Sequence, residues 1–324
     1  MKTVISTDRA AAVELLRKGD VVALPTETVY GLAADALNPI AVAKIFEAKE
    51  RPRFDPLIVH LPSREWLGRI ANFPAGDRRL TLNLADKFWP GPFTIILSKR
   101  EMVPDIVTAG LPTVAVRFSA HPVFAEIVGE LDEPLAAPSA NRFGHISPTT
   151  AQHVMDELQG RIPLIVDAGR TEHGIESTIV AVRDGRIAVL RRGPVADEQL
   201  SEFADVVGVA VTQRISAPGQ MPSHYAPTTP LRLIDKAEEF FAQKNQRVGL
   251  LAWKSSGNAP ASAERFAAVR NLSDRGELRE AAAGLFRYLR ELDALGLDLI
   301  VAERVPAYGL GAAIMDRLER ASHR

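Results

Sequence analysis

Cysteine is absent from the 324-residue chain, and its absence excludes several kinds of chemistry. The protein can form no disulfide, has no thiolate nucleophile, and cannot bind zinc or an iron–sulfur cluster through sulfur. Long apolar runs are also missing. No run approaches the roughly 20 residues that a membrane-spanning helix needs, and Met1–Ala10 has no signal-peptide core. We therefore expect a cytoplasmic protein with no membrane partner.

Excess charge of one sign and the familiar phosphate-binding loops are missing as well. The net charge of -1 gives no global attraction to nucleic acid or to an anionic membrane, so any anion site must be a local patch. The chain has no G-x-x-x-x-G-K-[ST] loop. Gly309-Leu310-Gly311 has Ile314 where a dinucleotide fingerprint needs its third glycine, so we expect only a helix start there. The histidines show no i, i+4 pair, and we expect no protein-built metal site.

What is present indicates two α/β domains. The chain is longer than the usual domain of roughly 100–200 residues, and with 46% hydrophobic and 24% charged residues it can bury a sizeable core. Four prolines and one glycine in 213–230 are typical of a linker. We therefore expect a first domain over 1–212, a proline-rich linker or lid over 213–230, and a second domain over 231–324.

Hydrophobic periodicity predicts strands interleaved with helices in both domains. In the first domain we expect helices at 7–18, 39–51, 63–71, 77–88, 122–131 and 148–160, strands at 21–24, 56–61, 93–97, 113–118, 135–137 and 164–167, and a hairpin over 177–191 turned at Asp184-Gly185. In the second we expect strands at 248–252, 266–272 and 298–302, and helices at 277–295 and 310–320. The helix at 148–160 is predicted with Ser147 as its cap and Pro148 at its first position. The expected sheet of the first domain is mixed, with a partly antiparallel arrangement.

The stretch 21–61 is the one around which the chain is organised, and it reads as strand, loop, helix, strand. Three hydroxyl side chains, Thr26, Thr28 and Tyr30, follow its first strand, where open α/β sheets bind ligands. Two cations, Lys49 and Arg51, lie at the end of its helix. Cations there can simply complement the negative end of the helix dipole. The neighbouring hydroxyl turn favours a second interpretation, in which both cations bind a ligand.

Further polar residues follow other predicted strands, and each alone has an ordinary structural explanation. Ser139 and Asn141 can build a turn through side-chain bonds, Ser147 can cap a helix, and His60 can be a satisfied core histidine. Taken together with Lys49, Arg51, Arg117 and Arg191, they suggest a local site for an anionic ligand, because guanidinium groups match phosphate and carboxylate oxygens. No nucleophile–base pair is evident. The pattern therefore points to positioning and charge neutralisation, as in phosphoryl and nucleotidyl transfer.

Several ordered motifs resemble the YrdC family, and the resemblance covers essentially the whole chain. These motifs are Pro25-Thr26-Glu27-Thr28-Val29-Tyr30-Gly31-Leu32, Lys49-Glu50-Arg51-Pro52, Pro56-Leu57-Ile58-Val59-His60, Trp89-Pro90-Gly91-Pro92, Ala137-Pro138-Ser139-Ala140-Asn141, Ser147-Pro148-Thr149, Gly174-Ile175-Glu176-Ser177-Thr178 and Leu190-Arg191. Ala217-Pro218-Gly219 and His224-Tyr225-Ala226-Pro227 resemble the long, two-domain branch of that family.

The resemblance implies a twisted mixed sheet with helices around a deep cavity, followed by a smaller Rossmann-like domain. It also implies L-threonylcarbamoyladenylate synthase activity, which joins L-threonine, bicarbonate and ATP into threonylcarbamoyl-AMP and releases pyrophosphate. Mg²⁺ is expected to bind mainly through the ATP phosphates. The product would pass to the tRNA threonylcarbamoyl transferase machinery for modification of adenosine in tRNA, and the first step would require no stable nucleic-acid binding.

The resemblance also assigns roles to residues, motif by motif. Lys49 and Arg51 are the implied catalytic pair. Those implied to contact threonine are Thr28, His60, Arg117, Ala137 and Ser177. Those implied to contact the nucleotide are Arg51, Asp55, Thr113, Ser139, Asn141, Ser147, Arg191 and Tyr225.

Three positions depart from the family pattern. Asp55 stands where we expect asparagine, so its charge needs an offset from Arg53 or Mg²⁺. Arg192 replaces a proline, which leaves open whether Arg192 or Arg191 reaches the ligand. Residues 220–223 replace a basic run.

Two other functions compete with this one. The first rival is an RNA-binding module with a basic concavity, whose affinity would depend on salt. The second is an enzyme with another carbamoyl acceptor.

Overall fold

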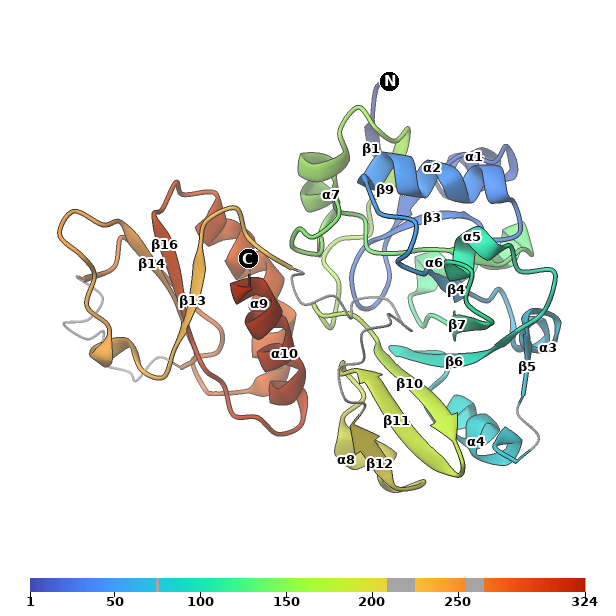
Figure 1. Ribbon diagram of the computed structural model, residues 1–324. Helices are drawn as coiled ribbons and strands as arrows, with labels where there is room; N and C mark the ends of the chain where they lie inside the picture. The colour runs from blue at the N-terminus through green and yellow to red at the C-terminus, as the bar shows by residue number, and fades with distance from the viewer. Residues whose placement is uncertain (74–75, 209–224, 255–264, 324) are drawn as a thin grey trace. The chain divides into compact units, whose positions relative to one another are not determined.

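The computed structural model describes residues 1–73, 76–208, 225–254 and 265–323 (Figure 1). The chain divides into two compact units. The first holds Met1–Phe143, Pro148–Glu172 and Glu176–Gln220, and the second holds Gly144–Ser147, His173–Ile175 and Met221–Arg324. Most of the expected linker, and residues 255–264 between two expected strands of the second domain, lie outside the described residues. No helix in the described ranges is both long and apolar enough to cross a membrane.

The first unit is built on one large mixed sheet. Its strands, in spatial order, are β1 (Val4–Ser6), β9 (Leu164–Val166), β2 (Val22–Leu24), β3 (Gly31–Asp35), β8 (Leu135–Ala136), β4 (Ile58–His60), β7 (Thr113–Arg117), β6 (Phe93–Lys99), β10 (Thr178–Arg183), β11 (Arg186–Arg191) and β12 (Val206–Gly208), with β5 (Ala71–Asn72) paired to β6. Both parallel and antiparallel neighbours occur along it. For example, β4 is parallel to β7 and antiparallel to β8. The expected mixed sheet is confirmed.

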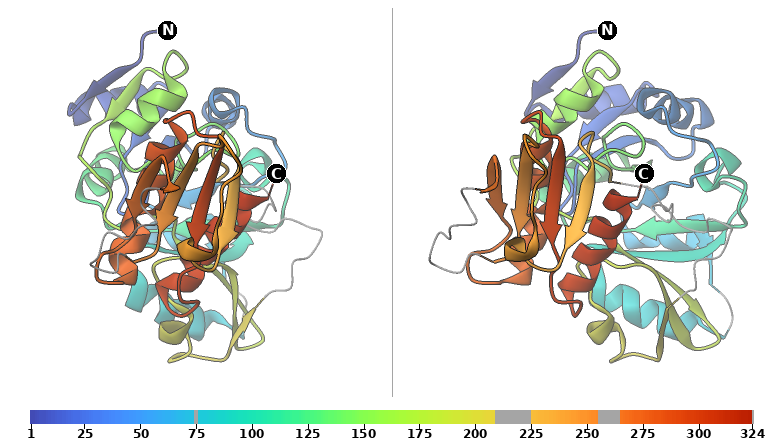
Figure 2. Two further views of the ribbon diagram at one scale, coloured as in Figure 1. Left: turned by 90° about the vertical axis from the view of Figure 1, so that its left-hand side faces the viewer. Right: turned by 60° about the vertical axis from the view of Figure 1, so that its left-hand side comes forward.

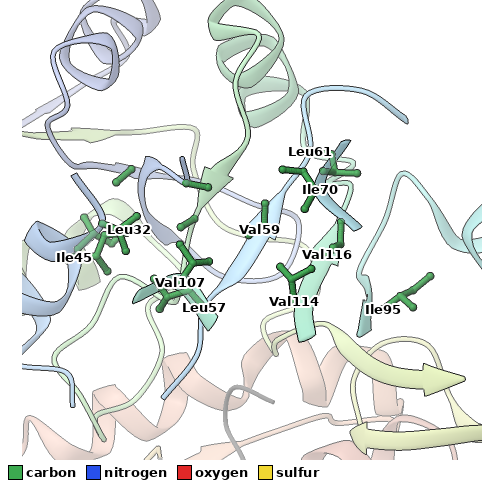
Figure 3. Close-up of a cluster of buried hydrophobic side chains, with 14 of the residues drawn as sticks. Leu32, Ile45, Leu57, Val59, Leu61, Ile70, Ile95, Val107, Val114 and Val116 are labelled. Carbon is green, nitrogen blue, oxygen red and sulfur yellow. The ribbon is translucent and has the colours of Figure 1, made fainter. Parts of the chain in front are cut away.

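Helices of the first unit cover both faces of this sheet. They are α1 (Arg9–Arg17), α2 (Pro39–Lys49), η1 (Arg64–Trp66), α3 (Leu67–Ile70), α4 (Arg78–Phe88), α5 (Asp105–Thr108), α6 (Pro122–Leu131), α7 (Ala151–Leu158) and α8 (Asp197–Leu200). Figure 3 shows Val59, Val116 and Ile95 among the side chains of the resulting core, which also holds Ile45 of α2 and Val107 of α5. Because side chains alternate along a strand, the residues between them point to the opposite face.

The short elements β1, β5, β12, α5 and α8 were not predicted, and two further segments of the first unit were misread. Helix α7 begins at Ala151 and is capped by Thr150, whose hydroxyl accepts from the His153 N–H at 3.2 Å, so Ser147 is not its cap. The reason is that the Pro148 carbonyl accepts from the Tyr30 N–H at 2.9 Å, which holds this segment as a loop beside the sheet.

The second misreading is β3, which was expected to be loop. Its sequence, Gly-Leu-Ala-Ala-Asp, is poor in β-branched residues and has low strand propensity. Pairing overrides that preference, because β3 is hydrogen-bonded to β2 on one side and to β8 on the other. The central stretch is therefore strand, loop, strand, helix, strand.

The second unit has a four-stranded parallel sheet in the order β13 (Leu231–Ile234), β16 (Leu299–Glu303), β14 (Val248–Ala252) and β15 (Ala268–Asn271). Helices α9 (Leu278–Asp293) and α10 (Leu310–Ser322) lie side by side against one face of this sheet (Figure 2). A short turn, η2 (Ala237–Glu239), belongs to the apolar cluster of the other face. Parallel strands require such coverage on both faces. The expected α/β unit is confirmed, with β13 added to it.

Candidate active site

Strand pairing brings residues from five strands into one row on the face of the first sheet opposite the core of Figure 3. His60 of β4 pairs with Arg117 of β7, Arg117 with Thr94 of β6, Thr94 with Ile179 of β10, and Ile179 with Arg191 of β11. We call these five residues the site row. Directly paired residues share a face of the sheet, so the side chains of two arginines, a histidine and a threonine line up across it.

A parallel row of apolar residues lies beside the site row on the same face. It consists of Ile58, Ala115, Ile96, Ala181 and Ala188, which are paired in that order and belong to one buried cluster. The polar side chains are therefore bordered by a surface that holds little water, and electrostatic interactions there are stronger than in bulk solvent.

A β-bulge brings Arg191 into the site row. The pairing of β10 with β11 shifts between Ile179 and Val180, so that Leu190 is an extra residue and Arg191 comes to lie opposite Ile179. In regular pairing Arg191 would face the core on the other side, next to Val189. Bulges recur beside active sites for this reason, since they redirect a side chain.

Arg191, rather than Arg192, is the inward arginine of this pair. Its Nε donates to the Ser177 carbonyl at 3.0 Å, and its Nη2 donates to the Ser177 hydroxyl at 3.0 Å. The same hydroxyl lies 2.8 Å from that of Thr94. Arg192 is exposed and pairs with Asp197 at 2.9 Å. The departure at Arg192 therefore does not displace Arg191.

Arg117 is held by a buried carboxylate. Its Nη2 lies 2.8 Å from Oε1 of Glu27 and donates to the Thr28 hydroxyl at 3.0 Å. Ser119 donates to the other oxygen of Glu27. Burial alone would raise the pKa of Glu27, but the Arg117 charge and hydrogen bonds from Ser119 and Arg117 lower it to about 2. Among the described residues, Arg117 Nε has no hydrogen-bond partner and can serve a ligand.

His60 is buried and uncharged at neutral pH. Burial, together with the adjacent Arg117 charge, lowers the pKa of its imidazole to about 3. The ring packs against Phe124 with centroids 4.9 Å apart. No partner for its Nδ1 is found within the described ranges. A neutral imidazole with an unused nitrogen beside a cation is suited to binding a ligand that carries both a carboxylate and a polar hydrogen.

Lys49 and Arg51 point inward, as the ligand-binding interpretation requires. The Lys49 side chain is buried, and its Nζ donates to the backbone carbonyls of Ser139, at 2.5 Å, and Asn141. These contacts are with a distant loop, so the helix dipole does not account for Lys49. Burial, reinforced by the nearby Arg51 charge, lowers the pKa of Lys49 well below its usual value.

The positive charge of Arg51 offsets the negative charge of the buried Asp55 carboxylate. Its Nη2 lies 2.8 Å from Oδ2 of Asp55, and both side chains are buried. The expected offset from Arg53 is wrong, because Arg53 is exposed. Burial raises the pKa of Asp55, whereas the charges of Arg51, Lys49 and Arg191 lower it. The influence of Arg191 connects this cluster electrostatically with the site row.

The structure gathers many of the predicted site residues, but not all of them. Thr28, Ser177 and the Lys49–Arg51 cluster, with the loop carrying Ser139 and Asn141, accompany the site row, and Ala137 joins the same sheet through its N–H bond to the Ile58 carbonyl at 3.0 Å. Thr113 begins β7, at the opposite end of that strand from Arg117. Ser147 and Tyr225 are buried within the second unit.

Sequence reasoning missed the roles of Glu27, Ser119 and Thr94. Glu27 lies between two predicted hydroxyl residues, and the need of a buried Arg117 for a counterion was a usable signal. Thr94 is an ordinary strand residue in sequence. Only its register opposite Arg117 and its contact with Ser177 identify it.

Comparisons with known proteins show which family this chain resembles. A family model for Sua5, YciO and YrdC proteins, described as "Telomere recombination", matches residues 14–193, and a model described as "Threonylcarbamoyl-AMP synthase, C-terminal domain" matches residues 195–323. The threonylcarbamoyl-AMP synthase of Pyrococcus abyssi is 39% identical over 96% of this chain and 93% of its own length. That of Bacillus subtilis is 40% identical over 97% of this chain and 92% of its own length.

A solved structure extends the likeness to the fold. The crystal structure of P. abyssi Sua5 complexed with L-threonine matches with a TM-score of 0.86 and 36% sequence identity, and the match covers 99% of this chain and 97% of the other. The chain therefore belongs to the Sua5–YciO–YrdC family, in the branch that carries the Sua5 C-terminal domain.

Proposed function

We propose that this protein is an L-threonylcarbamoyladenylate synthase, a nucleotidyltransferase that converts L-threonine, bicarbonate and ATP into threonylcarbamoyl-AMP and pyrophosphate. The observation that carries the proposal is the site row beside the Lys49–Arg51 cluster. Four cations, Lys49, Arg51, Arg117 and Arg191, are buried here, and the carboxylates paired with two of them are those of Asp55 and Glu27. The excess of positive charge suits a ligand with phosphate groups, and relatives named as this synthase span nearly the whole chain.

Threonine is assigned to the end of the site row that holds His60 and Arg117. The unused Nε of Arg117 would bind the carboxylate, since a guanidinium matches carboxylate geometry. The hydroxyl groups of Thr28 and Ser177 and the backbone of Ala137 would surround the rest of the amino acid. A site that bonds the threonine hydroxyl rejects valine, because binding valine leaves buried polar groups unpaired.

The nucleotide is assigned to the Lys49–Arg51 cluster and Arg191. Burial, reinforced by the nearby Arg51 charge, lowers the pKa of Lys49, and phosphates beside it would favour its charged form. The proposed nucleotide contacts beyond this cluster are Asp55, Thr113, Ser139, Asn141, Ser147 and Tyr225. These roles remain predictions.

The chemistry requires positioning more than proton transfer. The threonine amine and bicarbonate condense to a carbamate and release water. A carbamate oxygen then attacks the α-phosphorus of ATP, and the bond to the β-phosphate oxygen breaks as pyrophosphate leaves. Carbamate and triphosphate repel one another, so Lys49 and Arg51 would act by holding both anions and stabilising the charge that develops.

Mg²⁺ is part of this proposal as a companion of ATP. The described residues contain no group of three or more His, Asp or Glu side chains arranged for a metal ion, and the phosphate oxygens would supply most of the ligands. When bound, the ion neutralises the charge on the leaving pyrophosphate.

The product would be handed to the tRNA threonylcarbamoyl transferase machinery, and RNA would not be needed for its synthesis. The test is pyrophosphate release by the purified protein with ATP, Mg²⁺, L-threonine and bicarbonate, in the absence of RNA. We expect release to require both threonine and bicarbonate. Release that continues without threonine would indicate another carbamoyl acceptor, and release that appears only with RNA would favour the RNA-binding alternative.

A further inference from the structure

One face of α9 holds three segments that are far apart in sequence, all within the second unit. Ala283, Phe286, Arg290 and Asp293 are spaced by three, four and three residues, so they lie on one side of the helix. Each touches a different part of the three segments Gly144–Ser147, His173–Ile175 and 225–229.

The segment His173–Ile175 lies directly on the helix backbone. Gly174 has φ +69°, and a Cβ added to it would lie 2.6 Å from both the Cα and the carbonyl oxygen of Ala283 and 2.7 Å from the Ala282 carbonyl oxygen. A side chain at that position would clash with the backbone of α9, and residues other than glycine rarely adopt this positive φ. Only glycine therefore allows this segment to lie against α9.

The segment Gly144–Ser147 is bound through its backbone. Arg290 Nη2 donates to the carbonyl of Ile146, the residue before Ser147. The Gly144 carbonyl accepts from the Ala226 N–H at 2.9 Å, which ties this segment to the third one.

The third segment is fixed at two points. The ring of Tyr225 stacks on Phe286 with centroids 5.3 Å apart and an interplanar angle of 27°. Three residues later, the Asp293 carboxylate accepts from the N–H groups of Thr228, at 2.9 Å, and Thr229, at 2.7 Å. Tyr225 has φ +64°, a conformation that non-glycine residues adopt only when their surroundings impose it.

Each segment contains a residue assigned to ligand binding or ends two residues before one. Ser147 ends the first, Ser177 comes two residues after the second, and Tyr225 begins the third. We infer that the second domain serves the reaction through α9, with Arg290, Phe286 and the bare backbone at Ala283 as positioning elements for these segments. This inference rests on the proposed function and assigns its second domain a role.

The first test compares two glycines in the full-length protein. Gly174→Ala introduces both the clash and the strain, whereas Gly169→Ala introduces strain alone, because Gly169 has φ +77° with nothing near its Cβ position. We expect Gly174→Ala to raise the KM for threonine about 10- to 100-fold through displacement of Ser177, with Gly169→Ala near the wild-type value. Equal effects of the two substitutions would overturn the inference.

The second test uses Arg290 and separates this inference from the proposed function. Arg290→Met removes the donor to Ile146, and Arg290→Lys keeps one. In the full-length protein we expect Arg290→Met to raise the KM for ATP about 10-fold or more, with little change in kcat or in the KM for threonine, and Arg290→Lys to recover most of the loss. If Arg290 had a merely structural role, Arg290→Met would lower kcat and the melting temperature and would not affect the KM for ATP more than the KM for threonine.

Amide hydrogen exchange provides a readout that needs no activity. We expect exchange over 144–147 to accelerate in Arg290→Met while exchange in the strands of the first sheet is unchanged. If the wild-type protein proves inactive but this acceleration is seen, the proposed function fails and the positioning role of α9 stands. Unchanged exchange over 144–147 in Arg290→Met would refute the role of α9 whether or not the enzyme is active.

Discussion

At the scale of single residues, buried charge distinguishes this protein from a plain scaffold. Lys49, Arg51, Arg117 and Arg191 are all more than nine-tenths buried. Burying a cation is costly unless it is paired, and these four side chains are held by backbone carbonyls, hydroxyl groups and two buried carboxylates. The inward direction of Lys49 and Arg51 was predictable from the adjacent hydroxyl turn. The Glu27 counterion was missed, although the need of a buried Arg117 for a carboxylate was a usable signal, because Glu27 lies far from Arg117 in sequence.

Replacing Lys49 should abolish product formation with only a moderate loss of stability. Lys49→Met removes a cation that is unfavourable to bury, but it leaves two carbonyls without their donor, a loss of about 1–3 kcal/mol. Lys44→Met is the control, since Lys44 is on the same helix and its pair with Asp20 is partly exposed. Pyrophosphate release and thermal unfolding check both variants. Lys49→Met with wild-type turnover would contradict the assignment.

Replacing Arg51 alone should destabilise the protein as well as inactivate it. Arg51→Met leaves the Asp55 carboxylate buried without its partner, which costs about 3–5 kcal/mol. Arg51→Met combined with Asp55→Asn removes both charges and should recover most of that stability while remaining inactive. Urea unfolding of the single and double variants measures the difference. Recovery of turnover in the double variant would show that Arg51 serves only to neutralise Asp55.

His60 should make stability depend on pH. Its pKa is about 3 in the folded protein and 6.5 when unperturbed, so the unfolded chain binds more protons between these values and stability falls as pH falls through this window. We expect His60→Asn to flatten the slope of unfolding free energy between about pH 5 and about pH 6.5, above the range in which Glu27 titrates. His323→Asn, at an exposed position, is the control. An unchanged slope in His60→Asn would mean that His60 is charged in the native state.

At the scale of elements, patterns along the chain predicted most helices and strands but not their pairing. The helix from Pro39, the strand of His60 and the hairpin at Asp184-Gly185 follow from local signals. The site row does not, because it depends on register across five strands and on a bulge at Leu190. Strand β3 was missed for the same reason, since pairing with two neighbours outweighs its weak propensity.

The start of α7 gives a test at this scale. Thr150→Ala removes the cap and should lower the unfolding free energy by about 1 kcal/mol without changing the KM for ATP. Ser147→Ala removes no cap and should instead raise the KM for ATP. Denaturant unfolding and steady-state kinetics on both variants check this. The reverse pattern would restore Ser147 as the cap and remove it from the nucleotide site.

At the scale of the whole molecule, composition predicted two α/β units and a local rather than global anion site. The chain has a net charge of -1, yet four of its buried cations, Lys49, Arg51, Arg117 and Arg191, belong to the first unit, whereas Arg317 is buried in the second. This distribution favours a small anionic ligand over an extended nucleic acid, whose phosphates would need a broad positive surface. Periodicity could not reveal that two short segments from the middle of the chain belong to the second unit.

The most direct test of the central claim is mass detection of threonylcarbamoyl-AMP made by the purified full-length protein. Supplied with ATP, Mg²⁺, L-threonine and isotopically labelled bicarbonate, and without RNA, the protein should yield this adenylate with the label in its carbamoyl group, and Lys49→Met should yield none. Wild-type protein that is folded and binds ATP, but forms no labelled adenylate from these substrates, would contradict the account.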